Sequence, residues 1–145
     1  MKLTIRPASP QALEAIVSAR YGPPYEFYDG DGEPVLNPER YYEALDEQGS
    51  FVGHFYFEEK EGAVEIGLGL RPELTGQGLG LDFVIAGVKF ARRRWSSRRI
   101  VLSVAAFNER AIKVYERAGF RETGRHVRSF ERWGDVEFVD MEERR

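Results

Sequence analysis

The segment Leu68–Gly80, LGLRPELTGQGLG, constrains the fold of this 145-residue chain more than any other. An Arg-Pro pair ends an apolar run, and a glycine-dense turn then leads into a helix-forming segment. Because glycine has no Cβ, Gly76, Gly78 and Gly80 let backbone amides turn toward an anion, and a following helix adds its partial positive N-terminus. The segment therefore predicts a strand, an anion-binding turn and a helix, with a pyrophosphate as the expected ligand.

The residues around the turn separate three kinds of glycine loop. A P-loop of the NTPase type requires Lys-Ser/Thr after its last glycine, but Leu81-Asp82 follows Gly80. A dinucleotide-binding GxGxxG requires glycine at position 81, which leucine occupies. A G-x-G-x-G turn between a strand and a helix remains. On this segment alone, a tight turn that binds nothing is also open.

A second informative segment lies about thirty residues downstream. Asn108 is a good helix N-cap, Glu109 places negative charge in the first turn, and Gly119 is a typical C-terminal stop. Asn108 and Tyr115 are about two turns apart, so they project from nearly the same face of this short helix. An extended ligand could therefore meet both side chains, although each could also be only a cap and a packing residue.

Together, the two segments resemble the GNAT acyltransferases, whose coenzyme A pyrophosphate loop reads Q/R-x-x-G-x-G/A and whose later helix ends in Tyr, a few residues and Gly-Phe. The matching positions are Thr75, Gly78, Gly80, Tyr115, Gly119 and Phe120. Thr75 departs from the pattern, because Gln or Arg is usual there. The resemblance covers most of the chain and is weakest between Tyr21 and Pro38.

The resemblance implies acetyl-CoA as the acetyl donor and no metal. Loop amides would hold the diphosphate, the exposed edge of the preceding strand would pair with the pantetheine amides, and Asn108 would lie along the pantetheine arm. The expected cofactor-binding residues are Leu68, Gly69, Leu70, Thr75, Gly76, Gln77, Gly78, Leu79, Gly80 and Asn108.

The implied reaction is acetyl transfer to a primary amine by direct attack on the thioester. Tyr115 would hydrogen-bond to or protonate the departing thiolate. The base is less clear, because some relatives carry Glu at the position of Ser103. Glu65 is the expected substitute, ahead of His54, and each could instead be a bystander.

The loop from Tyr21 to Pro38 is rich in proline, glycine, aromatic and acidic residues. We expect it to form part of the acceptor wall, because such a mixture suits a cationic amine flanked by apolar surface. The expected substrate-binding residues are Tyr25, Glu26, Tyr28, Asp29 and His54. A structural lid without substrate contact remains the alternative.

The pattern of the whole chain predicts an α/β fold in one domain over residues 1–145. Strands are expected at Leu3–Arg6, Phe51–Phe57, Val64–Leu70, Ile100–Ala106, Phe120–Arg128 and Val136–Met141, and helices at about Pro10–Ala19, after the glycine turn, and after Asn108. Tyr41–Asp46 could be helical, but the following Gln48-Gly49 turn favours a hairpin. A helix between Val64–Leu70 and Ile100–Ala106 makes these strands parallel. The resemblance implies a GNAT fold: a mixed, mostly antiparallel sheet of about seven strands, a splayed parallel pair in its middle, and helices on both faces.

Composition narrows the remaining classes. The net charge is −3, divided into −7 for residues 1–72 and +4 for residues 73–145, so an anionic cofactor and a cationic amine would be drawn to different halves. The absence of cysteine excludes disulfides and a thiol nucleophile, and the acidic balance disfavours nucleic-acid binding. No apolar run approaches a membrane span, so we expect a cytoplasmic protein.

Two other functions stay open. The chain could be an acyl-CoA-binding sensor with little turnover, or an interaction domain that binds no nucleotide. Members of the family often pair terminal strands between subunits, so a homodimer is possible.

Overall fold

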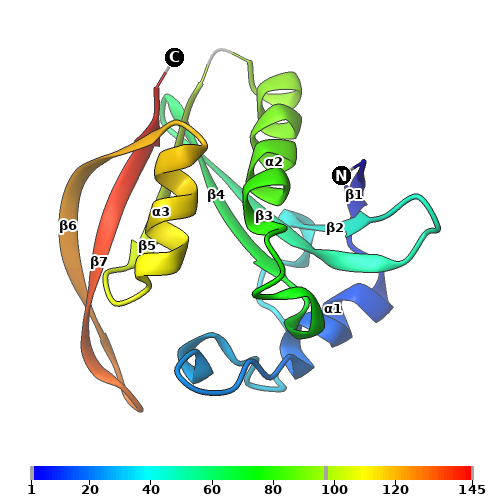
Figure 1. The fold of residues 1–145 in the computed structure, drawn as a ribbon, viewed down its shortest axis with the longest axis horizontal. Coiled ribbons are helices and arrows are strands. Elements are labelled where there is room, and N and C mark those ends of the chain that lie inside the picture. Colours follow the sequence, from blue (N-terminus) through cyan, green and yellow to red (C-terminus); the bar gives the residue numbers. More distant parts are fainter. Residues whose placement is uncertain (1, 97, 145) are drawn as a thin grey trace. The chain divides into compact units, whose positions relative to one another are not determined.

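The computed structural model describes residues 2–96 and 98–144. Its strands form one seven-stranded sheet in the order β1-β2-β3-β4-β5-β7-β6. Figure 1 labels the elements, which follow one another as β1 (Thr4–Pro7), α1 (Pro10–Ser18), β2 (Tyr41–Leu45), β3 (Phe51–Lys60), β4 (Ala63–Leu70), α2 (Gly80–Arg94), β5 (Arg99–Ala105), α3 (Glu109–Arg117), β6 (Phe120–Phe130) and β7 (Gly134–Glu143). Short 3-10 turns lie at Glu26–Tyr28, Pro38–Arg40 and Pro72–Leu74.

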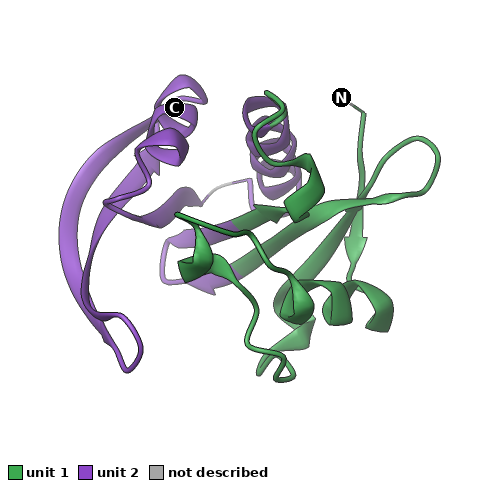
Figure 2. Ribbon diagram, turned by 60° about the horizontal axis from the view of Figure 1, so that its bottom comes forward, with its two compact units in different colours: residues 1–57, 68–79 green, residues 58–67, 80–145 purple. Residues whose placement is uncertain are grey.

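The chain forms two compact units, coloured separately in Figure 2. Unit 1 comprises residues 1–57 and 68–79, and unit 2 comprises residues 58–67 and 80–145. One domain over residues 1–145 stays a prediction. No helix in the described part of the chain is long and apolar enough to span a membrane.

Unit 1 is built on the antiparallel pairing of β1 with β2 and of β2 with β3. Ser9 is the N-cap of α1, because its hydroxyl accepts a hydrogen bond from the Ala12 amide at 3.1 Å. Tyr41–Leu45 is a strand, as the following turn favoured, and Gly49 closes that turn with φ of +80°. The apolar side chains of Val52, Phe55 and Phe57 are buried along β3.

Unit 2 packs its buried residues along α2 and the neighbouring strands. The buried apolar residues of α2 are Phe83, Val84, Val88 and Ala91. β5 buries alternate residues, including Ile100, Leu102 and Val104, as expected for a strand with one face on a core.

The parallel pair predicted from the connecting helix is present. β4 pairs with β5 through Ala63–Arg99, Val64–Ile100 and Glu65–Val101. Within the described residues this pairing ends there, although β4 continues to Leu70 and β5 to Ala105.

The last hairpin differs slightly from the sequence expectation. The expected strands end at Arg128 and resume at Val136, but the structure pairs Phe130 with Gly134, so the turn occupies residues 131–133. Gly134 adopts φ of +69°, the left-handed conformation that often closes a three-residue hairpin turn and starts the next strand.

Candidate active site

The glycine turn places two of its glycines in the left-handed conformation. Gly76 and Gly78 have φ of +73° and +77°, values that L side chains rarely adopt. The backbone amides of residues 76–79 donate to no other described residue, so their donors are available to a ligand. An anion bound here would satisfy amides that the fold leaves without an acceptor.

Side chains on the turn fold back onto it. The Thr75 hydroxyl donates to the Pro72 carbonyl at 2.7 Å, and the Gln77 side-chain amide donates to the Glu73 carbonyl at 2.8 Å. These contacts stabilise the turn before α2. They direct both side-chain donors to the protein backbone, which leaves the main chain as the donor set for an anion.

Within unit 2, the start of α2 lies against α3. A Cβ added to Gly80 would stand 3.7 Å from both terminal methyl groups of Val114, so the two helices approach closely at this point. Val114 immediately precedes Tyr115, so the last glycine of the motif and the helix that carries the predicted phenol are neighbours.

The α3 helix has the predicted boundaries. The Asn108 side chain accepts a hydrogen bond from the Ala111 amide at 3.1 Å, and Gly119 has φ of +102° just beyond the helix. Tyr115 is half-buried and makes an edge contact with Phe120, with 6.0 Å between ring centroids. Its ring is therefore held in place, and the phenol is not enclosed in the core.

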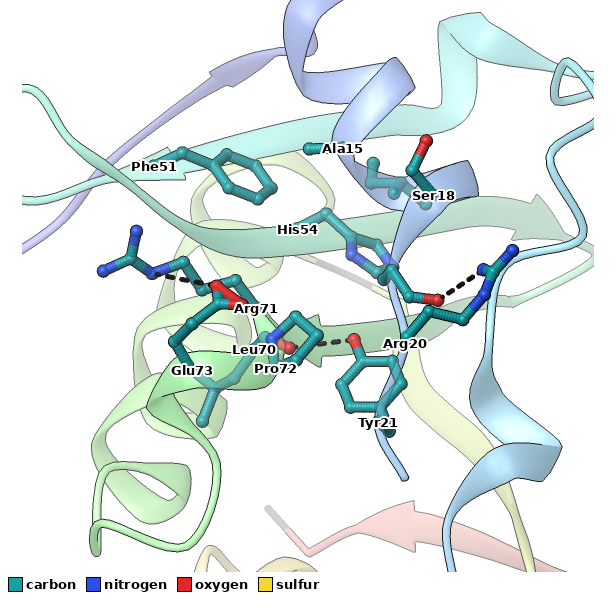
Figure 3. Close-up of a pocket in the computed structure, with 12 residues that line it drawn as sticks. Ala15, Ser18, Arg20, Tyr21, Phe51, His54, Leu70, Arg71, Pro72 and Glu73 are labelled. Carbon is teal, nitrogen blue, oxygen red and sulfur yellow. Dashed lines mark hydrogen bonds and ion pairs between the residues drawn. The ribbon is translucent and has the colours of Figure 1, made fainter. Parts of the chain in front are cut away.

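In unit 1, the end of β4 borders a cavity of about 420 Å³ (Figure 3). Tyr21 and His54 line it together with Phe51 and Leu70. The Tyr21 hydroxyl donates to the Leu70 carbonyl at 2.9 Å, which occupies one acceptor position at the strand end that was expected to meet the cofactor. Burial raises the pKa of Tyr21, and the charges of Asp29 and Glu73 raise it further, so the phenol stays protonated.

His54 faces Gly69 across this cavity wall. A Cβ on Gly69 would lie 2.8 Å from the His54 Cε1 atom, so only glycine leaves room for the imidazole. Burial lowers the pKa of His54 to about 4, which makes the ring neutral at physiological pH. An imidazole with so low a pKa is a weak proton acceptor.

Four predicted acceptor residues occupy other positions in unit 1. Tyr25 and Tyr28 lie 6.5 Å apart by ring centroid, Phe27 packs edge-on against Tyr28, and the Asp29 carboxylate accepts a hydrogen bond from the Tyr21 amide at 2.7 Å. Tyr25, Glu26, Tyr28 and Asp29 are not among the residues that line the cavity, whereas His54 is. Asp29 holds Tyr21, so its contribution to the cavity is indirect.

The predicted base Glu65 is engaged. Its carboxylate forms an ion pair with the Lys60 Nζ at 2.8 Å. To accept a proton from a substrate, Glu65 would first have to release this lysine.

Tyr21 was missed as a site residue, because a tyrosine at the start of a loop carries no local signal. Its contact with Leu70 joins residues 49 positions apart and depends on the tertiary fold.

Comparison with known proteins agrees with the geometry. A mycothiol acetyltransferase from Salinispora tropica is 32% identical over 101 residues, covering 66% of this chain and 33% of that protein. A mycothiol acetyltransferase from Acidothermus cellulolyticus is 42% identical over 67 residues, covering 46% of this chain and 20% of that protein. The chain thus spans a third or less of the length of these curated relatives.

Solved structures share the fold. A chimera based on the spermidine N-acetyltransferase of Vibrio cholerae matches with a TM-score of 0.76 and 20% identity, covering 99% of this chain and 95% of that one. A GNAT-family acetyltransferase from Bacillus anthracis matches with a TM-score of 0.74 and 18% identity, covering 98% and 94%.

The model of the acetyltransferase (GNAT) family matches residues 11–120. Because this match covers well over half of the chain, the protein belongs to the acetyltransferase (GNAT) family.

Proposed function

We propose that this protein transfers an acetyl group from acetyl-CoA to a primary amine by direct attack of the amine on the thioester. The observation that carries the proposal is the turn at residues 76–79, with two glycines at positive φ and amides that donate to no other described residue. Family membership supports the diphosphate of coenzyme A as the ligand of this turn.

The proposed cofactor contacts follow from the same elements. Backbone amides from Gly76 to Gly80 hold the diphosphate, and the backbone of Leu68–Leu70 pairs with the pantetheine arm. At Leu70 the carbonyl already accepts the Tyr21 hydroxyl, so a further bond there uses its second lone pair. Asn108 lies beside the arm while it caps α3.

Tyr115 is the proposed acid. A phenol can donate a hydrogen bond or a proton to the thiolate that leaves when the acetyl group is transferred. Its edge contact with Phe120 restricts the ring. Positioning of the reacting groups can lower the barrier of a two-substrate transfer by about 7–11 kcal/mol.

An acceptor amine such as a lysine side chain has a pKa of about 10.4, so it must lose a proton before it attacks. Glu65 stays a proposed base that requires displacement of Lys60. His54 is the weaker proposal, because burial lowers its pKa to about 4. We propose that His54 instead contacts the acceptor as a neutral imidazole, and that the loop bearing Tyr25, Glu26, Tyr28 and Asp29 forms the outer wall.

The deciding experiment measures thiol release from acetyl-CoA with a panel of amines: alkylamines, polyamines, amino sugars, amino acids and peptides with a free N-terminus. We expect release that depends on at least one amine. Binding of acetyl-CoA without release for any amine would instead indicate the sensor function, and absence of binding would contradict both.

A further inference from the structure

Three side chains from three strands of unit 2 form a hydrogen-bonded cluster. The Ser103 hydroxyl on β5 donates to the Asp140 Oδ1 on β7 at 2.7 Å, and the Nδ1 of His126 on β6 lies 3.1 Å from the Asp140 Oδ2. Ser103 and Asp140 are direct cross-strand partners. Because regular strands carry all three residues, the geometry of this Ser103–Asp140–His126 cluster is determined by the sheet.

The cluster is accessible from solvent. Val139 and Met141, the neighbours of Asp140 on β7, are buried on the opposite face of the strand. The side chains of His126 and Asp140 are 34% and 35% exposed. A small molecule can therefore reach the cluster without disturbing the core.

The cluster also lies beside the part of β5 that β4 leaves. Pairing of β5 with β4 ends at Val101, and Ser103 is the next residue on the same face of the strand. β5 then leads through Asn108 into the helix that carries Tyr115. Ser103 of the cluster thus lies on the strand that directly precedes the helix of the proposed acid.

The hydrogen bonds of His126 distinguish its two ring nitrogens. Arg128 Nε donates to His126 Nε2 at 2.8 Å, and arginine has no acceptor, so Nε2 carries a lone pair. The ring proton is then on Nδ1, where it points to Asp140. Nε2 thus receives an N–H from a cation, and a substrate ammonium is also a cationic N–H donor.

Asp140 differs from the neighbouring carboxylates in that its side-chain partners are a hydroxyl and an imidazole. Two neighbouring carboxylates have cationic partners: Glu65 pairs with Lys60 at 2.8 Å, and Glu142 pairs with Arg99 at 2.6 Å. The Asp140 carboxylate instead accepts hydrogen bonds from a hydroxyl and an imidazole.

Asp140 is ionised in this setting. Burial acts to raise its pKa, but the hydrogen bonds from Ser103 and His126 and the charge of Arg128 outweigh burial, so the pKa of Asp140 is lowered. Its negative charge would stabilise a positive imidazolium at His126, as a carboxylate behind a histidine does in other catalytic sites.

We infer, on the basis of the proposed acetyl transfer, that His126 Nε2 accepts the proton of the acceptor ammonium once that ammonium has replaced Arg128, with Asp140 and Ser103 as positioning residues. An N–H bond of the ammonium breaks, its electron pair stays on the amine nitrogen, and an N–H bond forms at Nε2. The positive charge moves from the amine to the imidazole, where Asp140 compensates it. The neutral amine then attacks the thioester carbonyl, a C–N bond forms, the C–S bond breaks, and the thiolate takes the Tyr115 proton. The second N–H proton that the amine loses as the amide forms restores Tyr115, and His126 returns the first proton to solvent.

The test is the pH dependence of kcat/KM for thiol release, measured with the best amine of the panel between about pH 6 and pH 10. For His126→Gln and Asp140→Asn we expect a loss of about 10²- to 10⁴-fold near neutral pH. The loss should shrink toward pH 10, because an amine with a pKa of about 10.4 then deprotonates without help. Arg128→Gln should lower KM for the amine, because the competing cation is gone.

Matched variants separate a catalytic effect from a structural one. Ser103→Ala removes one bond to Asp140 and should reproduce the effect in weaker form. Ser129→Ala removes a comparable Ser–Asp bond, to Asp135 near the end of the same hairpin, and should keep the parent profile. Glu65→Gln tests the other proposed base. Thermal unfolding and acetyl-CoA affinity are measured for every variant.

Parent-like pH profiles in folded His126→Gln and Asp140→Asn would overturn the inference, as would a changed profile in Glu65→Gln alone. If the parent releases no thiol with any amine, the proposed acetyl transfer fails. Binding of an amine at the cluster is then tested separately, by the ¹⁵N NMR signal of His126 Nε2 with and without propylamine. A shift on addition of the amine would support replacement of Arg128, and an unchanged signal would contradict it.

Discussion

At the scale of single residues, the Tyr115 hydroxyl is the group whose role can be tested with the least disturbance. Tyr115→Phe keeps the edge contact with Phe120 and removes only the proton donor. We expect turnover to fall about 10²- to 10⁴-fold, because the thiolate must leave unassisted. Residual activity should remain, since positioning of the two substrates is retained.

Steady-state kinetics with a separate titration of coenzyme A would check this prediction. Affinity for coenzyme A should change little, and Tyr42→Phe in unit 1 serves as a control that should match the parent. Equal turnover of Tyr115→Phe and parent would remove Tyr115 from the catalytic role.

Glu43 is the buried charge that joins the elements of unit 1. It is 2% exposed, and its carboxylate accepts hydrogen bonds from the Ser9 amide at 2.6 Å and from Arg6 Nε at 2.8 Å. Burial acts to raise the pKa of Glu43, but these bonds and the Arg6 charge outweigh it, so its pKa lies below the ordinary value of 4.5. We expect Glu43→Gln to lower the free energy of unfolding by about 1–3 kcal/mol at pH 7.

The lowered pKa determines the direction in which the stabilisation by Glu43 changes with pH. Because the pKa of Glu43 is lowered on folding, its stabilisation is complete above pH 4.5 and is lost as the pH falls through the lowered folded value. Urea unfolding of parent and variant should therefore converge in acid. A constant difference down to pH 2 would show that charge is not the source.

At the scale of elements, the glycine turn can be separated from ordinary backbone strain. Gly78→Ala places a side chain at φ of +77° where a Cβ meets nothing within 4 Å, so its cost is conformational. Gly49→Ala is matched, with φ of +80° and equally open surroundings in the β2–β3 hairpin. Both should lose about 1 kcal/mol of stability.

Only Gly78→Ala should weaken coenzyme A binding, by about tenfold or roughly 1.4 kcal/mol, because the altered turn no longer directs its amides at the diphosphate. Isothermal titration with coenzyme A measures this difference. Equal affinities of the two variants would show that the turn at Gly78 is not the diphosphate site.

The elements also show which features were predictable. The Asn108 cap and the stop at Gly119 were identified correctly, because each is decided by contacts within about four residues. The strand at Tyr41–Leu45 needed the neighbouring turn to distinguish it from a helix. The cluster of Ser103, Asp140 and His126 was not predictable, since it depends on the register of three strands and on an irregularity in pairing between Glu122 and Gly124.

At the scale of the whole molecule, ligand binding should be visible as stability. At a concentration of 100 Kd, acetyl-CoA should add about 2.7 kcal/mol to the free energy of unfolding. For a chain of 145 residues this corresponds to an increase in Tm on the order of 8 °C. NAD⁺, which carries a diphosphate but no pantetheine, should give a much smaller shift.

Differential scanning calorimetry with increasing acetyl-CoA would measure the effect. A Tm that does not respond to acetyl-CoA would leave an interaction domain as the remaining function. A response of equal size to NAD⁺ would mean that the turn binds diphosphates without recognising the thioester arm.

The sequence by itself determined the order of the elements, the glycine turn and the capped helix with Asn108 and Tyr115, because glycine spacing, caps and apolar periodicity act over a few residues. Only the tertiary structure decided which polar groups meet. Tyr21 meets Leu70, and His54 meets Gly69, only in the folded protein. These partners are set by strand register and by burial, which depend on residues far apart in the chain and leave no local pattern.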